Sequence, residues 1–169
     1  MKNIFIILFI FILSGTALSQ KSNTVNIDSV TVKNPDLLII LDSLIPKLHN
    51  CELYETYNLV LIDIAPYSND TFFVIITFDY MIDNTGLLQS SGYFVYKYYQ
   101  SFIYMENDSL FDTLFKRGNS KQFLLDPDEI PCLVNDDSKP DFAYYLSGGR
   151  FYYTEECFFP CGTLQHTKE

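Results

Sequence analysis

Apolar residues recur at helical spacing early in the chain and at alternate positions over much of the rest. Asn34 can cap a helix, Pro35 suits the first helical position, and Asp36 falls in the first turn. Apolar residues then follow at three- and four-residue spacing: Leu37, Ile40, Leu41, Leu44, Ile45 and Leu48. The pattern predicts a helix from Pro35 to about His49, with Pro46 loosening its last turn.

Strand-like patterns come after this helix. Residues 57–65 form a nearly continuous apolar run that ends at Pro66, which is typical of a strand covered on both faces. Residues 71–80 show a strand period, with the apolar Phe72, Val74, Ile76, Phe78 and Tyr80 on one face, and PYSND between the two runs predicts a hairpin. The segment DNTG at 83–86 predicts a turn, and GYFVYKYYQSFIYMEN after it predicts two more strands.

The sequence of the last third of the domain predicts a second short helix and a final hairpin. In SLFDTLFKR, Asn107 or Asp108 is the expected cap, Lys116 and Arg117 suit the C-terminal end, and Gly118 closes the helix. KQFLL suggests one more strand, and DFAYYL and RFYYTEE flank SGG as a hairpin.

This order of elements predicts an α+β fold. We expect an N-terminal helix packed on a mainly antiparallel curved sheet, with a second short helix and a C-terminal hairpin. Residues 34–161 should form a single domain, preceded by an arm or edge strand at 20–33 and followed by a tail at 162–169.

The first 19 residues predict export. Lys2 gives a short positive region, Ile4 to Leu13 is unbroken and apolar, and Ala17 and Ser19 suit a small-residue cleavage site. An apolar run this short does not cross a hydrocarbon layer of about 30 Å. We therefore expect a cleaved signal peptide, a secreted or periplasmic protein, and no membrane span after cleavage.

Net charge and cysteine content indicate what the protein can bind and how its fold can be cross-linked. The net charge of −10 repels phosphate backbones, which argues against nucleic-acid binding. An even number of cysteines in an exported chain predicts two disulfides, with three possible connectivities. These cysteines are Cys51, Cys132, Cys157 and Cys161.

Catalytic motifs are missing from the sequence. Its two histidines, His49 and His166, have no nucleophile at motif spacing, and there is no G-x-S-x-G, H-E-x-x-H or Gly-rich phosphate loop. Carboxylates are plentiful in the predicted loops, where solvation is the ordinary interpretation, and acid–base hydrolysis by a pair of them is the alternative. These pairs lie at Asp126, Asp128 and Glu129, at Asp136 and Asp137, and at Glu155 and Glu156.

One loop suggests calcium. LVNDDSKPDF resembles the D-x-N-x-D-G-x-x-D loop of FG-GAP/VCBS-type repeats, with Asn135, Asp137 and Asp141 at the third, fifth and ninth positions. The resemblance implies weak calcium ligation by these three side chains. Leu133 stands where that family has its first Asp, and Ser138 where it has Gly. An Asx-type turn explains the same letters without a metal, and we expect no other cofactor.

The tyrosines of the predicted strands suggest binding. They are too numerous to be buried together, because buried hydroxyls need partners. An exposed aromatic face often marks a site for a protein, a peptide or a glycan. The tyrosines concerned are Tyr93, Tyr96, Tyr98, Tyr99 and Tyr104.

We therefore expect a non-catalytic binding or accessory module with a tyrosine-rich sheet. The alternatives are a small secreted hydrolase that uses loop carboxylates and a weak calcium-binding domain. Catalysis predicts a concave pocket with convergent, partly buried carboxylates, whereas binding predicts an aromatic sheet face open to solvent.

The calcium alternative has a direct test in a thermal melt with millimolar Ca²⁺ or with EGTA. A ligand held only by the folded state at ten times its Kd adds about 1.4 kcal/mol of stability, which shifts the midpoint by a few degrees. The shift should vanish in Asp137→Ala. An unchanged midpoint in the parent protein would leave the segment an ordinary polar turn.

Overall fold

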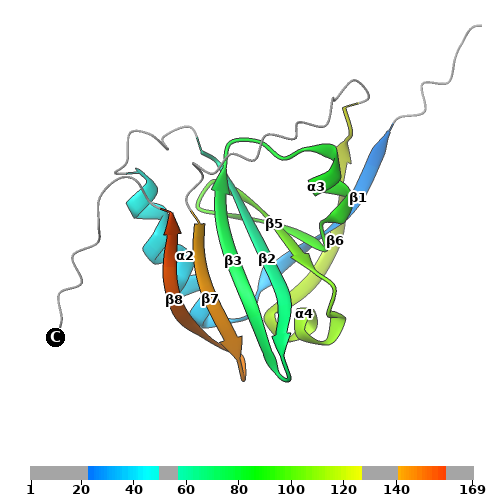
Figure 1. Ribbon diagram of the computed structural model, residues 1–169. Coiled ribbons are helices and arrows are strands. Elements are labelled where there is room, and N and C mark those ends of the chain that lie inside the picture. Colours follow the sequence, from blue (N-terminus) through cyan, green and yellow to red (C-terminus); the bar gives the residue numbers. More distant parts are fainter. Residues whose placement is uncertain (1–22, 50–56, 127–140, 159–169) are drawn as a thin grey trace, which may run out of the picture.

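The eight strands of the described residues all belong to one sheet. The computed structural model describes residues 23–49, 57–126 and 141–158 (Figure 1). Along the sheet the strands follow the order β6-β1-β4-β5-β2-β3-β7-β8. Their bounds are β1 Thr24–Val32, β2 Leu59–Ser68, β3 Thr71–Asp79, β4 Gly92–Tyr96, β5 Tyr99–Met105, β6 Phe115–Leu124, β7 Asp141–Ser147 and β8 Arg150–Phe158.

The sheet is mixed. β1 pairs in parallel with β4, and β2 pairs in parallel with β5, whereas every other neighbouring pair is antiparallel. The two parallel joints bring strands that are distant in sequence to the centre of the sheet. β2 consequently lies between β3 on one side and β5 on the other.

Within the described ranges, three helices accompany the sheet: α2 (Pro35–His49), α3 (Asn84–Gln89) and α4 (Asp108–Leu114). The Asn34 side chain caps α2 as predicted, accepting a hydrogen bond from the N–H of Leu37 at 3.0 Å. Asp83 caps α3 and Asn107 caps α4 in the same way. No helix of the described ranges is long and apolar enough to cross a membrane.

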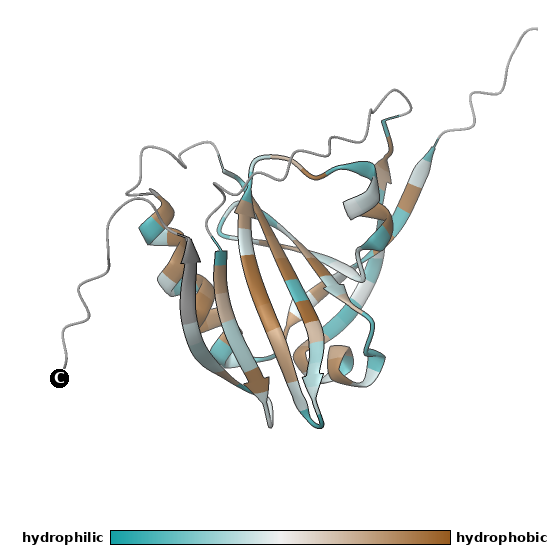
Figure 2. Cartoon of the chain, in the orientation of Figure 1, coloured by the Kyte–Doolittle hydropathy of each residue, from teal (hydrophilic) through white to brown (hydrophobic). Residues whose placement is uncertain are grey.

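The core has two parts, one on each face of the sheet. The larger one lies under α2 and α4 and takes alternate residues of the central strands, including Val60, Ile62 and Ile64 of β2. The smaller one lies under α3 and takes residues of opposite parity, such as Leu59, with Leu61 packed at its margin. Figure 2 shows β2 as hydrophobic over much of its length, with a hydrophilic interruption within the strand. As predicted for residues 57–65, this strand packs on both faces.

The predicted hairpins form. β2 and β3 pair from Leu59 with Asp79 to Ser68 with Thr71. β7 and β8 join at Gly148 and Gly149, both with positive φ. Lys97 and Tyr98 join β4 to β5, also with positive φ, in a two-residue turn that carries neither Gly nor Asn.

The prediction of an α+β fold is wrong. The described chain is mainly β, a mixed eight-stranded sheet with a few short helices, although most of its strand pairs are antiparallel as predicted. Two segments, residues 24–32 and 115–124, add strands that the sequence pattern does not predict in full. Residues 24–32 form an interior strand and not an arm or edge strand, because β6 pairs along one side of β1 and β4 along the other.

Residues 115–124 form β6, of which the sequence pattern predicts only the last part as a strand. α4 ends at Leu114, so Lys116, Arg117 and Gly118 lie in β6 and not at the end of a helix. A Cβ on Gly118 would come within 2.9 Å of the Ser29 hydroxyl oxygen, where the pairing with β1 shifts register. The glycine therefore permits a bulge in the sheet and does not close a helix.

Two smaller predictions also change. DNTG does not form a simple turn but leads into α3, because the Asp83 carboxylate accepts the N–H of Gly86 at 2.6 Å and starts the helix. Pro66 does not end β2, which continues to Ser68 through a register shift opposite β3.

Asn34 should contribute measurably to stability, because it caps α2 and its amide also donates to the carbonyl of Gly149 at 2.6 Å. Losing both bonds in Asn34→Ala should lower the free energy of unfolding by about 2 kcal/mol. Asn34→Ser keeps a capping oxygen and should lose about half as much. Urea unfolding of the three proteins measures this. Equal losses in the two variants would show that the cap contributes nothing.

Candidate functional site

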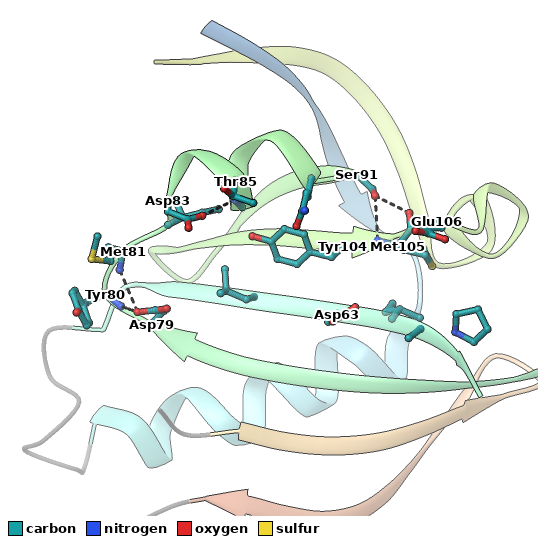
Figure 3. Close-up of a pocket in the computed structure, with 17 residues that line it drawn as sticks. Asp63, Asp79, Tyr80, Met81, Asp83, Thr85, Ser91, Tyr104, Met105 and Glu106 are labelled. Carbon is teal, nitrogen blue, oxygen red and sulfur yellow. Dashed lines mark hydrogen bonds between the residues drawn. The ribbon is translucent and has the colours of Figure 1, made fainter. Parts of the chain in front are cut away.

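A cleft of about 970 Å³ opens on the α3 face of the sheet (Figure 3). The residues that line it come from the middle of β2, the end of β3, the segment leading into α3, and the end of β5. Four carboxylates belong to it: Asp63, Asp79, Asp83 and Glu106. They come from separate parts of the sequence, and the sheet order brings them together.

Asp63 and Tyr104 are neighbours on the floor of this cleft. Parallel pairing puts Asp63 of β2 in register with Tyr104 of β5, so both side chains project from the same face. Figure 3 shows the Tyr104 ring in the centre of the site. Burial raises the pKa of Tyr104, and the negative charges of Asp83, Asp63 and Asp79 raise it further. The phenol therefore remains protonated at physiological pH and offers an O–H group among three carboxylates.

Asp79 and Asp83 are held by the backbone of the turn that they flank. The Asp79 side chain is only 3% exposed, and its Oδ1 accepts the N–H of Tyr80 at 2.7 Å and that of Met81 at 3.4 Å. Asp83 accepts the N–H of Gly86. These bonds fix both carboxylates before any ligand arrives, which reduces the ordering cost of binding.

Gly86 keeps the space between Asp83 and Tyr104 open. A Cβ at this position would lie 3.1 Å from the Asp83 Oδ1, 3.1 Å from the Tyr104 hydroxyl oxygen and 2.9 Å from Ile82. The two oxygens therefore flank one point at the wall of the cleft. A side chain on residue 86 would push into this space.

Asp63 is the carboxyl whose acidity is changed most clearly by the cleft. Its side chain keeps access to solvent, yet the surrounding walls remove enough water to raise its pKa. A hydrogen bond from the backbone of Ile64 opposes this rise only in part. Asp63 interrupts the apolar run of β2, and desolvation by that run raises its pKa.

The charged side chains that line the cleft are all acidic. Among the described residues that line it there is no Lys, Arg or His. Its remaining walls include the apolar side chains of Leu61, Met81 and Ile82. The site can therefore attract a positive charge and also hold an apolar stem next to it.

The five tyrosines singled out in the sequence do not share one surface. Tyr93 is buried in the smaller core, and Tyr99 is buried in the larger one. Tyr96 donates to Asp42 of α2 at 2.5 Å, while Tyr98 is 96% exposed at the β4–β5 turn. Of the five, Tyr104 is the one that lines the cleft.

The other predicted site residues fall largely outside the described ranges. Cys51, Cys132 and Cys161 lie outside them, as do Asn135 and Asp137, and the structure describes only the backbone of Cys157, in β8. Asp141 begins β7, where it pairs with Thr77. Disulfides and calcium ligation stay predictions. Within the described ranges, no group of three or more His, Cys, Asp or Glu side chains is placed to hold a metal ion.

Sequence reasoning missed the residues that make the cleft. It looked for carboxylates in polar loops, whereas Asp63 and Asp79 belong to strands and Asp83 to a helix cap. One signal was available. A charged residue in the middle of the apolar run LVLIDIAP has to face either solvent or a polar site.

Comparison with protein-family models, with curated proteins and with solved structures finds no match to this chain. Its function therefore has to be inferred from the chemistry of the cleft.

The raised pKa of Asp63 gives a pH-dependent stability of definite sign. Between its ordinary value of 3.8 and its raised value, the folded state binds the proton more readily than the unfolded state. Stability due to Asp63 therefore falls as pH rises through this window. Asp63→Asn should unfold at higher urea than the parent at pH 7, and the difference should shrink at pH 3.5.

Asp42 is the matched control, because the hydrogen bond from Lys97, and after it the one from Tyr96, lowers its pKa. Its contribution is present at pH 7 and is lost as pH falls through the lowered pKa, so Asp42→Asn should destabilise at pH 7. Carboxyl ¹³C titration should give midpoints above 3.8 for Asp63 and below it for Asp42. The reverse order would refute this account of the cleft.

Proposed function

We propose that this chain is an exported binding protein whose acidic cleft receives a positively charged group, an ammonium or a guanidinium. The observation that carries the proposal is a cleft lined by four carboxylates, with no basic side chain in its described lining. The apolar segment at residues 4–13 and the cleavage-site residues after it support export.

The electrostatics of the cleft favour this ligand. Three carboxylates lie close enough to Tyr104 to raise its pKa, so their negative charges all act on this part of the cleft. A cation placed beside Tyr104 is attracted by all three, in a space with less water than the open surface. Their hydrogen bonds to backbone N–H groups keep Asp79 and Asp83 in position.

The apolar walls suit the rest of a lysine-like or arginine-like group. Leu61, Met81 and Ile82 can pack against a chain of methylene groups while its charged end reaches the carboxylates. Tyr104 adds a neutral phenol that can donate to a carboxylate next to the cation or accept from the cation itself. A small inorganic ion would leave these apolar contacts unused.

Hydrolysis is a second candidate, because Asp63 has the raised pKa that suits a general acid and other carboxylates lie in the same cleft. Sugar cleavage needs a second carboxylate across the scissile bond. Glu106, which directly follows β5 and is exposed, is the candidate for this second carboxylate. Release of reducing sugar from soluble polysaccharides, lost in Asp63→Asn, would support this function over binding.

A pair of isosteric probes tests the cation proposal. N-acetyl-lysine methylamide carries one ammonium, and its norleucine counterpart has the same stem length to within one atom but no charge. The lysine probe should shift the amide NMR signals of residues lining the cleft, with a Kd that rises with salt, whereas the norleucine probe should not bind. Asp63→Asn and Asp83→Asn should each weaken binding by about three- to tenfold.

The Asn substitutions are chosen to keep the fold. Asn is as good a helix cap as Asp, so Asp83→Asn retains the start of α3 while removing its charge. Asp28→Asn on β1 is the control, since it removes one exposed carboxylate that pairs with Arg117 away from the cleft. Equal weakening by Asp28→Asn would indicate attraction by net charge alone and would contradict a specific site.

A further inference from the structure

An exposed aromatic row continues the cleft across the sheet. Direct cross-strand pairing aligns Ala65 of β2 with Phe73 of β3, Phe73 with Tyr145 of β7, and Tyr145 with Tyr152 of β8. Residues paired in this way project from the same face. We call Phe73, Tyr145 and Tyr152, together with Tyr67, the aromatic row.

Ring contacts hold this row together. The Tyr145 ring lies 4.9 Å from the Tyr67 ring and 5.6 Å from the Phe73 ring, centroid to centroid. Tyr67 is 63% exposed and Tyr152 is 55% exposed. The row is therefore a packed but open aromatic surface, in contrast to Tyr98, which stands alone on its turn.

No helix of the described chain covers this surface. α2 packs against the alternate residues of the same strands, such as Val74 and Tyr144, which belong to the larger core on the opposite face. In Figure 1, β2, β3, β7 and β8 lie side by side, with α2 behind β7 and β8. The face that carries the row is thus the one turned away from α2.

The row and the cleft are continuous. Ala65 lines the cleft and is also the direct partner of Phe73. Two residues before Ala65, Asp63 pairs with Tyr104 of β5 on one side and with Ile75 of β3 on the other. An extended molecule can therefore pass from the carboxylates onto the aromatic rings without leaving the sheet face.

We propose that the occupant of this combined surface is a polypeptide segment with a lysine or arginine side chain in the cleft and apolar side chains on the aromatic row. The proposal rests on the proposed function, because the basic residue is assigned to the acidic cleft. Charge complementarity selects the partner: the cleft demands a cation, and peptides commonly join a cation to neighbouring apolar groups. A neutral glycan would meet the rings but leave the carboxylates unmatched.

The dimensions favour a segment over a small amine. From β2 to β8 the row crosses three strand spacings, about 14 Å in all. An extended chain rises about 3.3 Å per residue, so four or five residues span this length. A free diamine or amino acid would fill the cleft and leave the row empty.

Two blocked peptides separate the contributions of cleft and row. One has a lysine followed by Leu-Phe-Leu-Phe, and the other has a lysine followed by four serines. The apolar peptide should bind at least about tenfold more tightly than the serine peptide, which should match N-acetyl-lysine methylamide. Acetylating the lysine side chain of the apolar peptide should abolish binding.

Variants locate the effect. Tyr67→Ser combined with Tyr152→Ser should remove the advantage of the apolar peptide while leaving the lysine probe unaffected, which also shows that the protein remains folded. Tyr98→Ser is the matched control, since it removes an exposed tyrosine that lies outside the row. Its affinity for the apolar peptide should equal that of the parent.

The possible failures are distinguishable. Equal affinities for the two peptides, with the lysine probe bound, would overturn the role of the row and leave the cation site intact. Binding of the apolar peptide without binding of the lysine probe would overturn the proposed function and this inference with it. Binding of cellohexaose that is lost in the double tyrosine variant, without binding of either peptide, would overturn the choice of a polypeptide.

Discussion

The parallel pairing of β2 with β5 is the constraint on which the rest of this structure depends. It places β2 in the interior of the sheet, where both of its faces have to be covered, and so divides the core between α2 on one side and α3 on the other. α3 is short and covers only part of its face. The cleft lies where this cover ends, and the same pairing sets Asp63 next to Tyr104 inside it.

The chemistry of the cleft follows from this geometry and not from any local motif. Asp63 lies in the middle of an apolar strand, and the incomplete cover leaves its carboxyl with some water but less than at an open surface. Asp79 at the end of β3 and Asp83 at the start of α3 accept hydrogen bonds from backbone N–H groups. In these positions their negative charges also raise the pKa of Tyr104. One set of residues thus shapes the turn and sets the potential of the site.

Elements defined by local patterns could be predicted from the sequence, and their assembly could not. The cap and apolar stripe of α2, the β2–β3 hairpin and the glycine turn between β7 and β8 all have signals within about twenty residues. β6 was mistaken in part for a helix, because Lys116, Arg117 and Gly118 have the composition of a helix end, and only β1 as a partner reveals the strand. The site is non-local in the same sense. Nothing near Asp63 in sequence indicates that Tyr104 will lie beside it.

The position of β1 has a consequence for the order of folding. β1 is the first strand of the described chain, yet its long antiparallel partner β6 comes about ninety residues later, with Thr24 opposite Leu124 at the extreme. Pairing at such separation is slow, because the loop between the strands has to close before any contact rewards it. A nascent chain that ends before β6 leaves the hydrogen-bonding groups on one side of β1 unpaired. Until residues 115–124 have been synthesised, that side of β1 can pair with another strand, which is the ordinary route to aggregation.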